Sequence, residues 1–486
     1  MLFNSIDFII FFVLFFVAFL AIRDRHYKHL LILGASYFFF YYTSNYLISL
    51  LIFSTILDFY VGKKIWECTS KQKKKILLVC SIAGNLGLLG FFKYSDFAIT
   101  QFNQIGQSLG ISEIPYLSLA LPIGISFYTF QTLSYTIDIY RGHLTPSKSI
   151  KEFAVYVAFF PQLVAGPIIR ASQFLPQLRE KISNYQTEGI SQKFIRNSNF
   201  KTGLTMIAFG FMFKMFFADN IDPLANQLEN SMGFNSSMII LSTIAYGMQI
   251  YGDFSGYSSI AIGIALLLGF KIPINFNKPY FATSPSDFWK RWHISLSTWL
   301  KDYLYIPLGG NKKSSSRTYL NLFAVMFFGG LWHGASWNFV IWGILHGSYL
   351  AIHKVITNKF PHIKDNMFFK NRWGTVLSIL VTQYFIFLAW IPFRVQDGST
   401  MLHAIEKYIL FDFQFDYLPI FISKYSFEII LIVLFMSINF ISYKIDLIDK
   451  ISNLKMRYWT LFFAGVVLSI LFFYGGNSEE FIYFQF

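Results

Sequence analysis

Charged residues are scarce in this chain of 486 residues. They make up 14% of the sequence, whereas soluble domains carry about 25%. Hydrophobic residues account for 54% of the chain, and its mean hydropathy is +0.47. These values exclude an ordinary soluble domain, and they predict an all-α polytopic membrane protein.

Acidic residues are also few, at 26 against 40 lysines and arginines, which gives a net charge of +14. The positive charges gather in segments 63–75, 170–201 and 354–372, whereas segment 219–235 holds acidic residues and no lysine or arginine. The positive-inside rule places the basic loops in the cytoplasm, and alternation of the spans then places the acidic segment outside. Basic residues distributed over membrane loops do not indicate nucleic acid as a partner.

Only two cysteines occur, Cys68 in a basic loop and Cys80 in an apolar run, so we expect no disulfide between them. No cysteine–histidine cluster has the spacing of metal ligands, and we expect no metal site. Repeats, low-complexity tracts and long polar linkers are also absent from the sequence. We therefore expect one membrane domain over residues 1–486, with an N-terminal bundle at 1–116, a central functional core at 117–350 and a C-terminal bundle at 351–486.

Apolar runs follow one another along the whole chain, and several fall short of the roughly 20 residues that a simple crossing needs. We expect about 10–13 transmembrane or re-entrant helices. The first run, residues 5–22, lacks a basic leader and a small-residue cleavage site, so we expect it to be a retained span. Asp253 and Ser255 interrupt the apolar stretch 238–270, where we expect a partial or broken span, with Asp253 lining a cavity or capping a half-helix.

His333 lies inside the hydrophobic stretch 320–350, and the stretches on either side of it are basic. If this stretch is a hairpin that enters the bilayer from the cytoplasm, residues 318–332 span about 20 Å and place His333 within the hydrocarbon core. An ionisable side chain at that depth usually lines a cavity or performs chemistry. A neutral imidazole is suited to moving a proton near pH 7. The alternative is a histidine that is simply hydrogen-bonded within the bundle.

The loop 271–317 is neither a span nor an ordinary hydrophilic loop. It holds eight lysines and arginines against two aspartates, a net charge of +6. We expect an amphipathic helix with its N-cap at Ser286 or Asp287 and with His293 on the apolar face. That histidine could be structural or functional. The positive face could bind either anionic lipid headgroups or a phosphate-bearing substrate. The apolar face comprises Trp289, Trp292, His293, Leu296, Trp299, Leu300 and Tyr303, and the polar face Lys290, Arg291, Thr298, Lys301 and Asp302.

A further histidine, His346, follows His333 by 13 residues, which is about 220° around an ideal helix. If the segment were one continuous helix, the two side chains could not share a face. We therefore expect His346 to be structural.

Several longer segments resemble the membrane-bound O-acyltransferase family, and within it the branch of the alginate O-acetyltransferases and related polysaccharide and peptidoglycan O-acetyltransferases. The resemblance covers almost the whole chain, with one small departure at Lys290, where this branch often has arginine. The matching segments are residues 121–131, 159–168, 253–257, 287–297, 302–310, 330–334 and 481–486.

The resemblance implies a helical bundle whose central tunnel joins a cytoplasmic funnel to an extracytoplasmic opening. It implies that His333, in the Trp332-His333-Gly334 segment, is the catalytic histidine and that His293 is a second site residue. It also implies acetyl transfer from a cytoplasmic donor, expected to be acetyl-CoA, with no bound cofactor. We expect donor-binding roles for Trp289, Lys290, Arg291, Asp253, Ser255 and Trp332.

The resemblance further implies a bacterial inner-membrane protein that contacts lipid, modifies an extracytoplasmic polysaccharide and works with a separate extracytoplasmic acetyltransferase. Three other functions stay open at this point. The chain could transfer D-alanyl groups from a small carrier protein, or it could be a transporter or flippase with His333 and Asp253 as proton-relay residues. It could also be an inert scaffold of an envelope complex.

Overall fold

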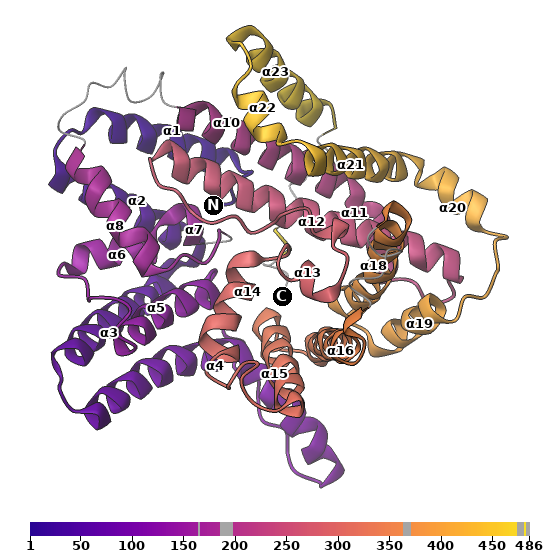
Figure 1. Cartoon of the computed structure of the whole chain (residues 1–486), viewed down its shortest axis with the longest axis horizontal. Coiled ribbons are helices and arrows are strands. Elements are labelled where there is room, and N and C mark those ends of the chain that lie inside the picture. Colours follow the sequence, from indigo (N-terminus) through magenta and orange to yellow (C-terminus); the bar gives the residue numbers. More distant parts are fainter. Residues whose placement is uncertain (164–165, 185–197, 363–370, 474–480, 483–486) are drawn as a thin grey trace. The chain divides into compact units, whose positions relative to one another are not determined.

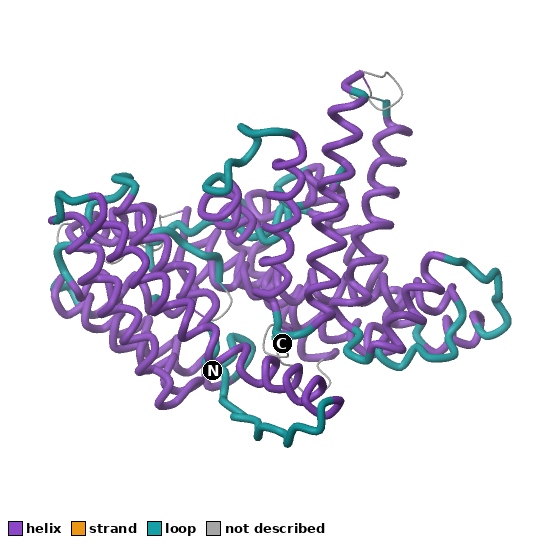
Figure 2. Tube along the Cα trace, turned by 90° about the horizontal axis from the view of Figure 1, so that it is seen from below, coloured by secondary structure: helices purple, strands orange, loops and turns teal. Residues whose placement is uncertain are grey.

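We describe the protein from a computed structural model, which describes residues 1–163, 166–184, 198–362, 371–473 and 481–482. Within those ranges every regular element is a helix and none is a strand (Figure 2). The expected all-α class is therefore confirmed. The chain divides into two compact units, residues 1–204 with 261–273, and residues 205–260 with 274–486.

The first unit consists mainly of the helices that Figure 1 colours indigo to magenta. Phenylalanine rings fill much of its core: Phe160 lies against Phe11, Phe15 and Phe39, with ring centroids 5.1 to 5.8 Å apart. Its helices are α1 (Ile6–Ala21), α2 (Arg25–Ser44), α3 (Ile48–Glu67), α4 (Lys71–Ser108), α5 (Ile125–Tyr140), α6 (Ile150–Ala158), α7 (Phe160–Leu163) and α8 (Ala171–Asn184).

A buried carboxylate joins α3, α4 and α5 in this unit. Asp58 accepts hydrogen bonds from Ser81 Oγ at 2.6 Å and from Asn85 Nδ2 at 2.9 Å. Ser81 also lies 3.0 Å from Thr136 Oγ1 on α5. Buried polar groups are tolerated when hydrogen-bonded, so this network fixes how the three helices pack.

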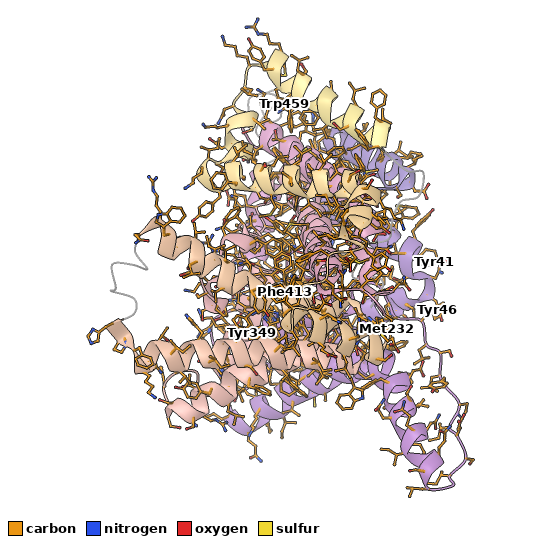
Figure 3. All side chains as sticks on the ribbon, turned by 90° about the vertical axis from the view of Figure 1, so that its right-hand side faces the viewer. Tyr41, Tyr46, Met232, Tyr349, Phe413 and Trp459 are labelled. Atoms are coloured by element: carbon orange, nitrogen blue, oxygen red, sulfur yellow. The ribbon has the colours of Figure 1, made fainter. Side chains whose placement is uncertain are left out.

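The second unit contains the candidate site residues. Helix α10 (Ser198–Phe211) continues into a π-helical turn at Met212–Ala218 and then into α11 (Asp219–Ala225). The indole of Trp459, labelled in Figure 3, donates to Thr205 Oγ1 on α10 at 3.0 Å. The other helices that lie wholly or mainly in this unit are α12 (Ser236–Leu267), α13 (Pro285–Phe288), α14 (Ile294–Leu300), α15 (Ser315–His333), α16 (Trp337–Lys359), α18 (Arg372–Arg394), α19 (Gly398–Ile409), α20 (Leu418–Lys424), α21 (Ser426–Lys444), α22 (Leu447–Ser452) and α23 (Met456–Phe473).

Eight helical stretches of the described chain are long and apolar enough to cross a membrane. One of them, residues 26–67, divides at Asn45 into α2 and α3, each of 20 residues. The shorter helix Ile6–Ala21 is also apolar. The protein is thus a multi-pass membrane protein.

The expected interruption at Asp253 is wrong. Helix α12 runs without a break through Asp253 and Ser255 for 32 residues. The charge of Asp253 is tolerated inside the helix because Lys214 Nζ lies 2.7 Å from its carboxylate. The backbone N–H of Ile482 donates to the same carboxylate at 2.8 Å. Paired charges of this kind remove the need for a broken helix.

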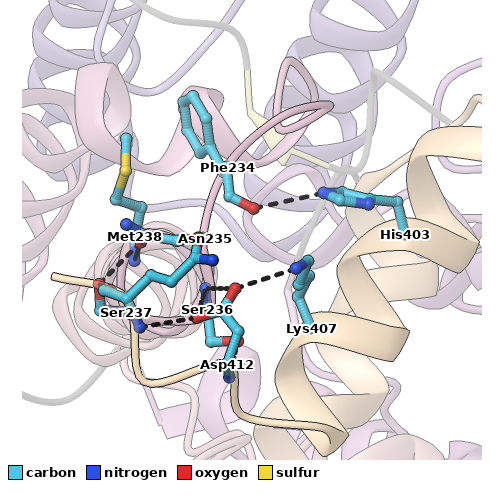
Figure 4. A network of polar contacts seen from close by, with 9 residues as sticks. Phe234, Asn235, Ser236, Ser237, Met238, His403, Lys407 and Asp412 are labelled. Atoms are coloured by element: carbon cyan, nitrogen blue, oxygen red, sulfur yellow. Dashed lines mark hydrogen bonds and ion pairs between the residues drawn. The ribbon is translucent and has the colours of Figure 1, made fainter. Parts of the chain in front are cut away.

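Figure 4 shows the polar network at the start of α12. The Asp412 carboxylate accepts from the backbone N–H of Ser236 at 3.3 Å and pairs with Lys407 Nζ at 3.0 Å. His403 Nε2 lies 3.3 Å from the carbonyl oxygen of Phe234. The Asp412 carboxylate and Asn235 Oδ1, which accepts from the Met238 N–H at 3.1 Å, thus serve N–H groups that lack intrahelical acceptors.

Candidate active site

His333 is the last residue of α15, and a three-residue turn then reverses the chain into α16. The expected hairpin is therefore observed, and its two helices are labelled α15 and α16 in Figure 1. The His333 ring is only 4% exposed. Its centroid lies 4.9 Å from that of Trp342 and 5.1 Å from that of Phe393. Aromatic side chains thus fix the position of this imidazole.

Glycines allow the two helices of the hairpin to approach closely. A Cβ added at Gly330 would lie 2.2 Å from the carbonyl oxygen of Phe339, and one at Gly343 would lie 2.5 Å from that of Met326. At Gly334, directly after the histidine, an added Cβ would meet the Phe339 ring at 2.1 Å. The glycine of the Trp332-His333-Gly334 segment is thus required by packing beside the imidazole.

His293 lies at a sharp bend rather than within a helix. Helix α13 ends at Phe288, α14 begins at Ile294, and His293 adopts a left-handed conformation with φ +41° and ψ +54°. The expected continuous amphipathic helix is therefore wrong. The expected N-cap is wrong as well, because Ser284 accepts from the Asp287 N–H and Pro285 occupies the first helical position.

The burial pattern expected for this segment is nevertheless confirmed. Trp292, His293, Leu296, Trp299 and Tyr303 are buried. On the opposite side, Lys290, Thr298 and Lys301 are exposed. The bend changes the backbone path and keeps the separation of apolar and polar side chains.

Asn275 holds the bend from the preceding loop. Its carbonyl oxygen accepts from the Ile294 N–H at 2.9 Å, and its Oδ1 accepts from Ser295 Oγ at 2.6 Å. Its Nδ2 donates to Ser258 Oγ on α12 at 3.1 Å. A positive φ is uncommon in a residue other than glycine, and it persists when neighbouring contacts hold the backbone in that conformation. The hydrogen bonds of Asn275 hold the backbone of His293 in this way.

The structure brings His293 and His333 into one aromatic cluster. The His293 centroid lies 5.7 Å from that of Trp332 and 4.7 Å from that of Phe254. Trp332 in turn lies 5.1 Å from the neighbouring His333 ring. Burial lowers the pKa of His293 to about 3, so its imidazole is neutral near pH 7 and can form hydrogen bonds without carrying charge.

Asp253 and Ser255 lie on α12 on either side of Phe254, the residue that contacts His293. The Asp253 carboxylate belongs to an ion-pair network, in which Lys214 Nζ also lies 2.8 Å from Asp219. These contacts connect α12 to the π-helical turn and to Ile482, and they give Asp253 a structural task. Of the matching C-terminal segment, residues 483–486 lie outside the described part of the chain.

The residues expected to bind the donor differ in their exposure. Trp289 is half-buried, with its ring centroid 5.7 Å from that of Trp342. Lys290 is exposed, whereas the Arg291 Nε is paired with Asp287 at 2.9 Å. The guanidinium of Arg291 also lies 6.0 Å from the Tyr443 ring.

A further cation near this position was not expected from the sequence. Lys444 Nζ lies 5.6 Å from the same Tyr443 ring that Arg291 contacts. The two cations are more than 150 residues apart in the sequence, so no local pattern could connect them. Arg291 and Lys444, with Lys290 next to Arg291 in the sequence, make up a basic group of the second unit.

Comparisons with known proteins show similarity over most of the chain. The model of MBOAT, the membrane-bound O-acyltransferase family, matches residues 141–391. The probable alginate O-acetylase AlgI of Pseudomonas aeruginosa is 36% identical over 413 residues, covering 85% of this chain and 75% of that protein. The peptidoglycan O-acetyltransferase of Helicobacter pylori is 35% identical over 401 residues, with coverages of 77% and 72%.

A more distant relative is the teichoic acid D-alanyltransferase of Bacillus subtilis, which is 27% identical over 278 residues, covering 54% of this chain and 66% of that protein. The two O-acetyl-transferring relatives and the D-alanyl-transferring one share acyl transfer as their activity. The expected resemblance is confirmed by the family model and by the extent of these matches. The chain therefore belongs to the membrane-bound O-acyltransferase family, and it is an acyltransferase.

Proposed function

We propose that this protein is an O-acetyltransferase of the bacterial inner membrane, which transfers acetyl from cytoplasmic acetyl-CoA for O-acetylation of an extracytoplasmic polysaccharide. The observation that carries the proposal is that His293 and His333 both lie against the ring of Trp332. The two histidines are 40 residues apart in the sequence and come from different helices. The O-acetyl-transferring relatives support acetyl as the group that is moved.

In the proposed reaction, neutral His333 accepts the proton of the attacking hydroxyl. The hydroxyl oxygen forms a bond to the thioester carbonyl carbon, the carbon–sulfur bond breaks, and the proton passes from His333 to the leaving thiolate. His293 hydrogen-bonds the thioester or the acceptor and orients it. General-base assistance of this kind contributes typically about 10²- to 10⁴-fold in rate.

The donor phosphates would bind near the basic group formed by Lys290, Arg291 and Lys444. Lys290 is exposed and free to reach a phosphate, whereas Arg291 would first have to share its guanidinium with Asp287. Trp289 and Trp332 would line the path of the donor, and Ser255 lies one residue from the His293 contact Phe254. Asp253 would act indirectly, by holding α12.

The acceptor would be alginate, peptidoglycan or another envelope polysaccharide, reached through a separate extracytoplasmic acetyltransferase. D-alanyl transfer from a carrier protein is the second candidate, supported by the similarity to a teichoic acid D-alanyltransferase. Reconstituted protein given acetyl-CoA and a D-alanyl carrier protein in competition separates the two. Transfer from either donor also excludes a pure transporter and an inert scaffold.

The central test is His333→Ala in proteoliposomes supplied with acetyl-CoA. We expect acetyl transfer to fall by about 10²- to 10⁴-fold at unchanged membrane abundance, because the general base is removed. His403→Ala serves as the control, since His403 is on α19 and contacts the Phe234 carbonyl in another network. Retained transfer by well-expressed His333→Ala protein would remove this histidine from the mechanism.

A further inference from the structure

The last turn of α18 packs directly against His333. Phe393, the residue before the end of this helix, is 1% exposed and lies edge-on to the His333 ring, with the two centroids 5.1 Å apart. Its ring also lies 5.0 Å from that of Phe339 and 5.5 Å from that of Trp342. The position of the imidazole therefore depends on where the last turn of α18 lies.

A proline weakens this turn. Pro392 lies inside α18, and because it has no backbone N–H it cannot donate to the carbonyl oxygen of Leu388. The turn that carries Phe393 thus relies more on contacts from outside the helix. One of them comes from Asn338 on α16, whose Nδ2 donates to the carbonyl oxygen of Val395.

The other contact comes from Arg394, the last residue of α18, whose side chain is only 10% exposed. Its Nε lies 3.3 Å from Glu229 Oε1, and its Nη2 donates to Asn226 Oδ1. The guanidinium also lies 5.6 Å from the Tyr246 ring on α12. Both polar partners belong to the acidic segment 219–235, so this arginine joins the end of α18 to that segment.

The partners of Arg394 are themselves held in place. Asn226 donates from Nδ2 to the Asp222 carboxylate on α11, and Gln249 on α12 donates to the other oxygen of the same carboxylate. An isolated exposed ion pair fixes a position weakly. Here a connected set of hydrogen bonds links α12, α11 and the end of α18.

Packing alone does not require an arginine at position 394. An apolar side chain there would avoid the free-energy cost of removing a charge from water. A guanidinium, however, presents several N–H donors in a rigid plane, and two acceptors at fixed positions therefore define its orientation. This property suits a residue that sets the direction of a helix end.

We propose that Arg394 is a positioning residue that acts on His333 through Phe393. Its contacts with Glu229 and Asn226 fix the last turn of α18, and this turn sets where the imidazole lies relative to the attacking hydroxyl. The inference rests on the proposed function, in which His333 is the general base. A displacement of about 1 Å at a reacting group can lower the rate about 10²-fold.

Steady-state kinetics in proteoliposomes test this role with Arg394→Gln, which removes the charge, and Arg394→Lys, which keeps it. We expect Arg394→Gln to lower kcat about 10- to 100-fold and to leave KM for acetyl-CoA within about threefold, because no residue proposed to bind the donor is changed. Arg394→Lys should recover kcat to within about fivefold of the natural protein. Unchanged kcat in Arg394→Gln, or a loss confined to KM, would overturn the inference.

The matched control is Arg179→Gln. It removes an arginine whose Nε lies 2.9 Å from Glu152 in the first unit. We expect this variant to keep kcat and KM within about twofold of the natural protein. A loss equal to that of Arg394→Gln would show that any broken arginine ion pair has this effect, and the inference would fail.

A double variant separates positioning from a general loss of stability. We expect Phe393→Leu to lower kcat by itself, and addition of Arg394→Gln to lower it by less than about twofold more, since the connection to His333 is already interrupted. Destabilisation would instead act independently of the residue at position 393. Losses that multiply in the double variant would therefore overturn the inference.

Glu229→Lys tests the same contact from its accessible end, because the Glu229 side chain is 41% exposed. It places a second cation beside Arg394, and we expect kcat to fall about tenfold, with no further loss when Arg394→Gln is added. Asn230→Lys, which adds the same charge at the exposed neighbouring position, should keep the natural kcat. If Arg394→Gln does not accumulate in the membrane, the natural kcat in Glu229→Lys would overturn the inference.

The choice of donor keeps the two proposals apart. If the natural protein uses a D-alanyl carrier protein and not acetyl-CoA, the proposed acetyl transfer fails. The same variants, assayed with the carrier as donor, then still decide whether Arg394 positions His333. Full transfer by His333→Ala protein would overturn both the general base and its positioning residue.

Discussion

His293 is an imidazole that folding keeps neutral, because burial lowers its pKa to about 3. In the unfolded chain a histidine titrates near pH 6.5. As the pH falls below that value, the unfolded state gains a proton that the folded state does not, so folding stability decreases. The contribution of neutral His293 to the free energy of unfolding has its full value above about pH 6.5 and decreases as the pH falls from there toward 3.

We expect His293→Asn to flatten the loss of thermal stability of the detergent-solubilised protein between pH 7 and pH 5. The difference from the natural protein at pH 5 should be about 2 kcal/mol, as an order of magnitude for a group held neutral at 1.5 pH units below its ordinary pKa. Asn453→Ala, at the exposed position directly after α22, is the control and should keep the natural slope. Parallel pH curves for His293→Asn and the natural protein would contradict the neutral buried state.

Asn275 is a positioning residue at the same scale. It binds Ile294 and Ser295 directly after His293, and it ties them to Ser258 of α12. We expect Asn275→Ala to lower kcat about 10- to 100-fold with little change in KM for acetyl-CoA, because a small displacement of a reacting group carries a cost of that size. The check is steady-state kinetics at matched membrane abundance. A change confined to KM would place Asn275 in donor binding instead.

Sequence patterns found the two histidines and missed the residues that position them. His333 and His293 are recognisable because they are polar groups in apolar surroundings within matching segments. Asn275 lies in a segment without periodicity. Its role becomes visible only in the structure, where its carbonyl oxygen accepts a hydrogen bond from the Ile294 N–H. Lys214 and Lys444 were missed for the same reason: Lys214 pairs with Asp253, 39 residues away, and Lys444 lies near Arg291 only because both contact the Tyr443 ring.

At the scale of elements, the main error was the single helix through residues 286–303. Side-chain periodicity reports which face is buried, and it reported that correctly. It cannot reveal a bend when the apolar side chains before and after the bend stay buried on the same side of the segment. Two local signals indicate where α13 begins: Ser284 as a capping residue and Pro285 in the first turn. The left-handed turn at His293 is fixed by contacts from the loop before α13, which no local pattern contains.

The hairpin of α15 and α16 gives a prediction at this scale. An Ala at position 334 would place its Cβ against the Phe339 ring, whose position beside His333 would have to change. We expect Gly334→Ala to destabilise the protein by about 1–3 kcal/mol, the usual effect of overpacking, and to reduce acetyl transfer strongly. Adding Phe339→Leu should restore stability and part of the activity. If Gly334→Ala behaves as the natural protein, close packing at the turn is not what requires this glycine.

At the scale of the whole molecule, the continuity of α12 predicts the topology of the region that holds the candidate site. The acidic segment 219–235 precedes this helix and the basic loop 271–317 follows it. A single crossing places the two segments on opposite sides of the membrane. The sequence left this open, because Asp253 and Ser255 suggested a broken span and the pairing of Asp253 with Lys214 could not be foreseen.

Cysteine labelling tests this topology in intact cells. After Cys68 and Cys80 are replaced by serine, a single cysteine is introduced at an exposed position as Asn230→Cys or Lys312→Cys. We expect a membrane-impermeant maleimide to label Asn230→Cys from outside, and Lys312→Cys only after permeabilisation, because the positive-inside rule retains the basic loop in the cytoplasm. Lys73→Cys, in the first basic loop, should behave as Lys312→Cys does. Labelling of Lys312→Cys from outside would place the basic group around Lys290 on the wrong side for a cytoplasmic acetyl donor, and the proposed direction of transfer would have to be reversed.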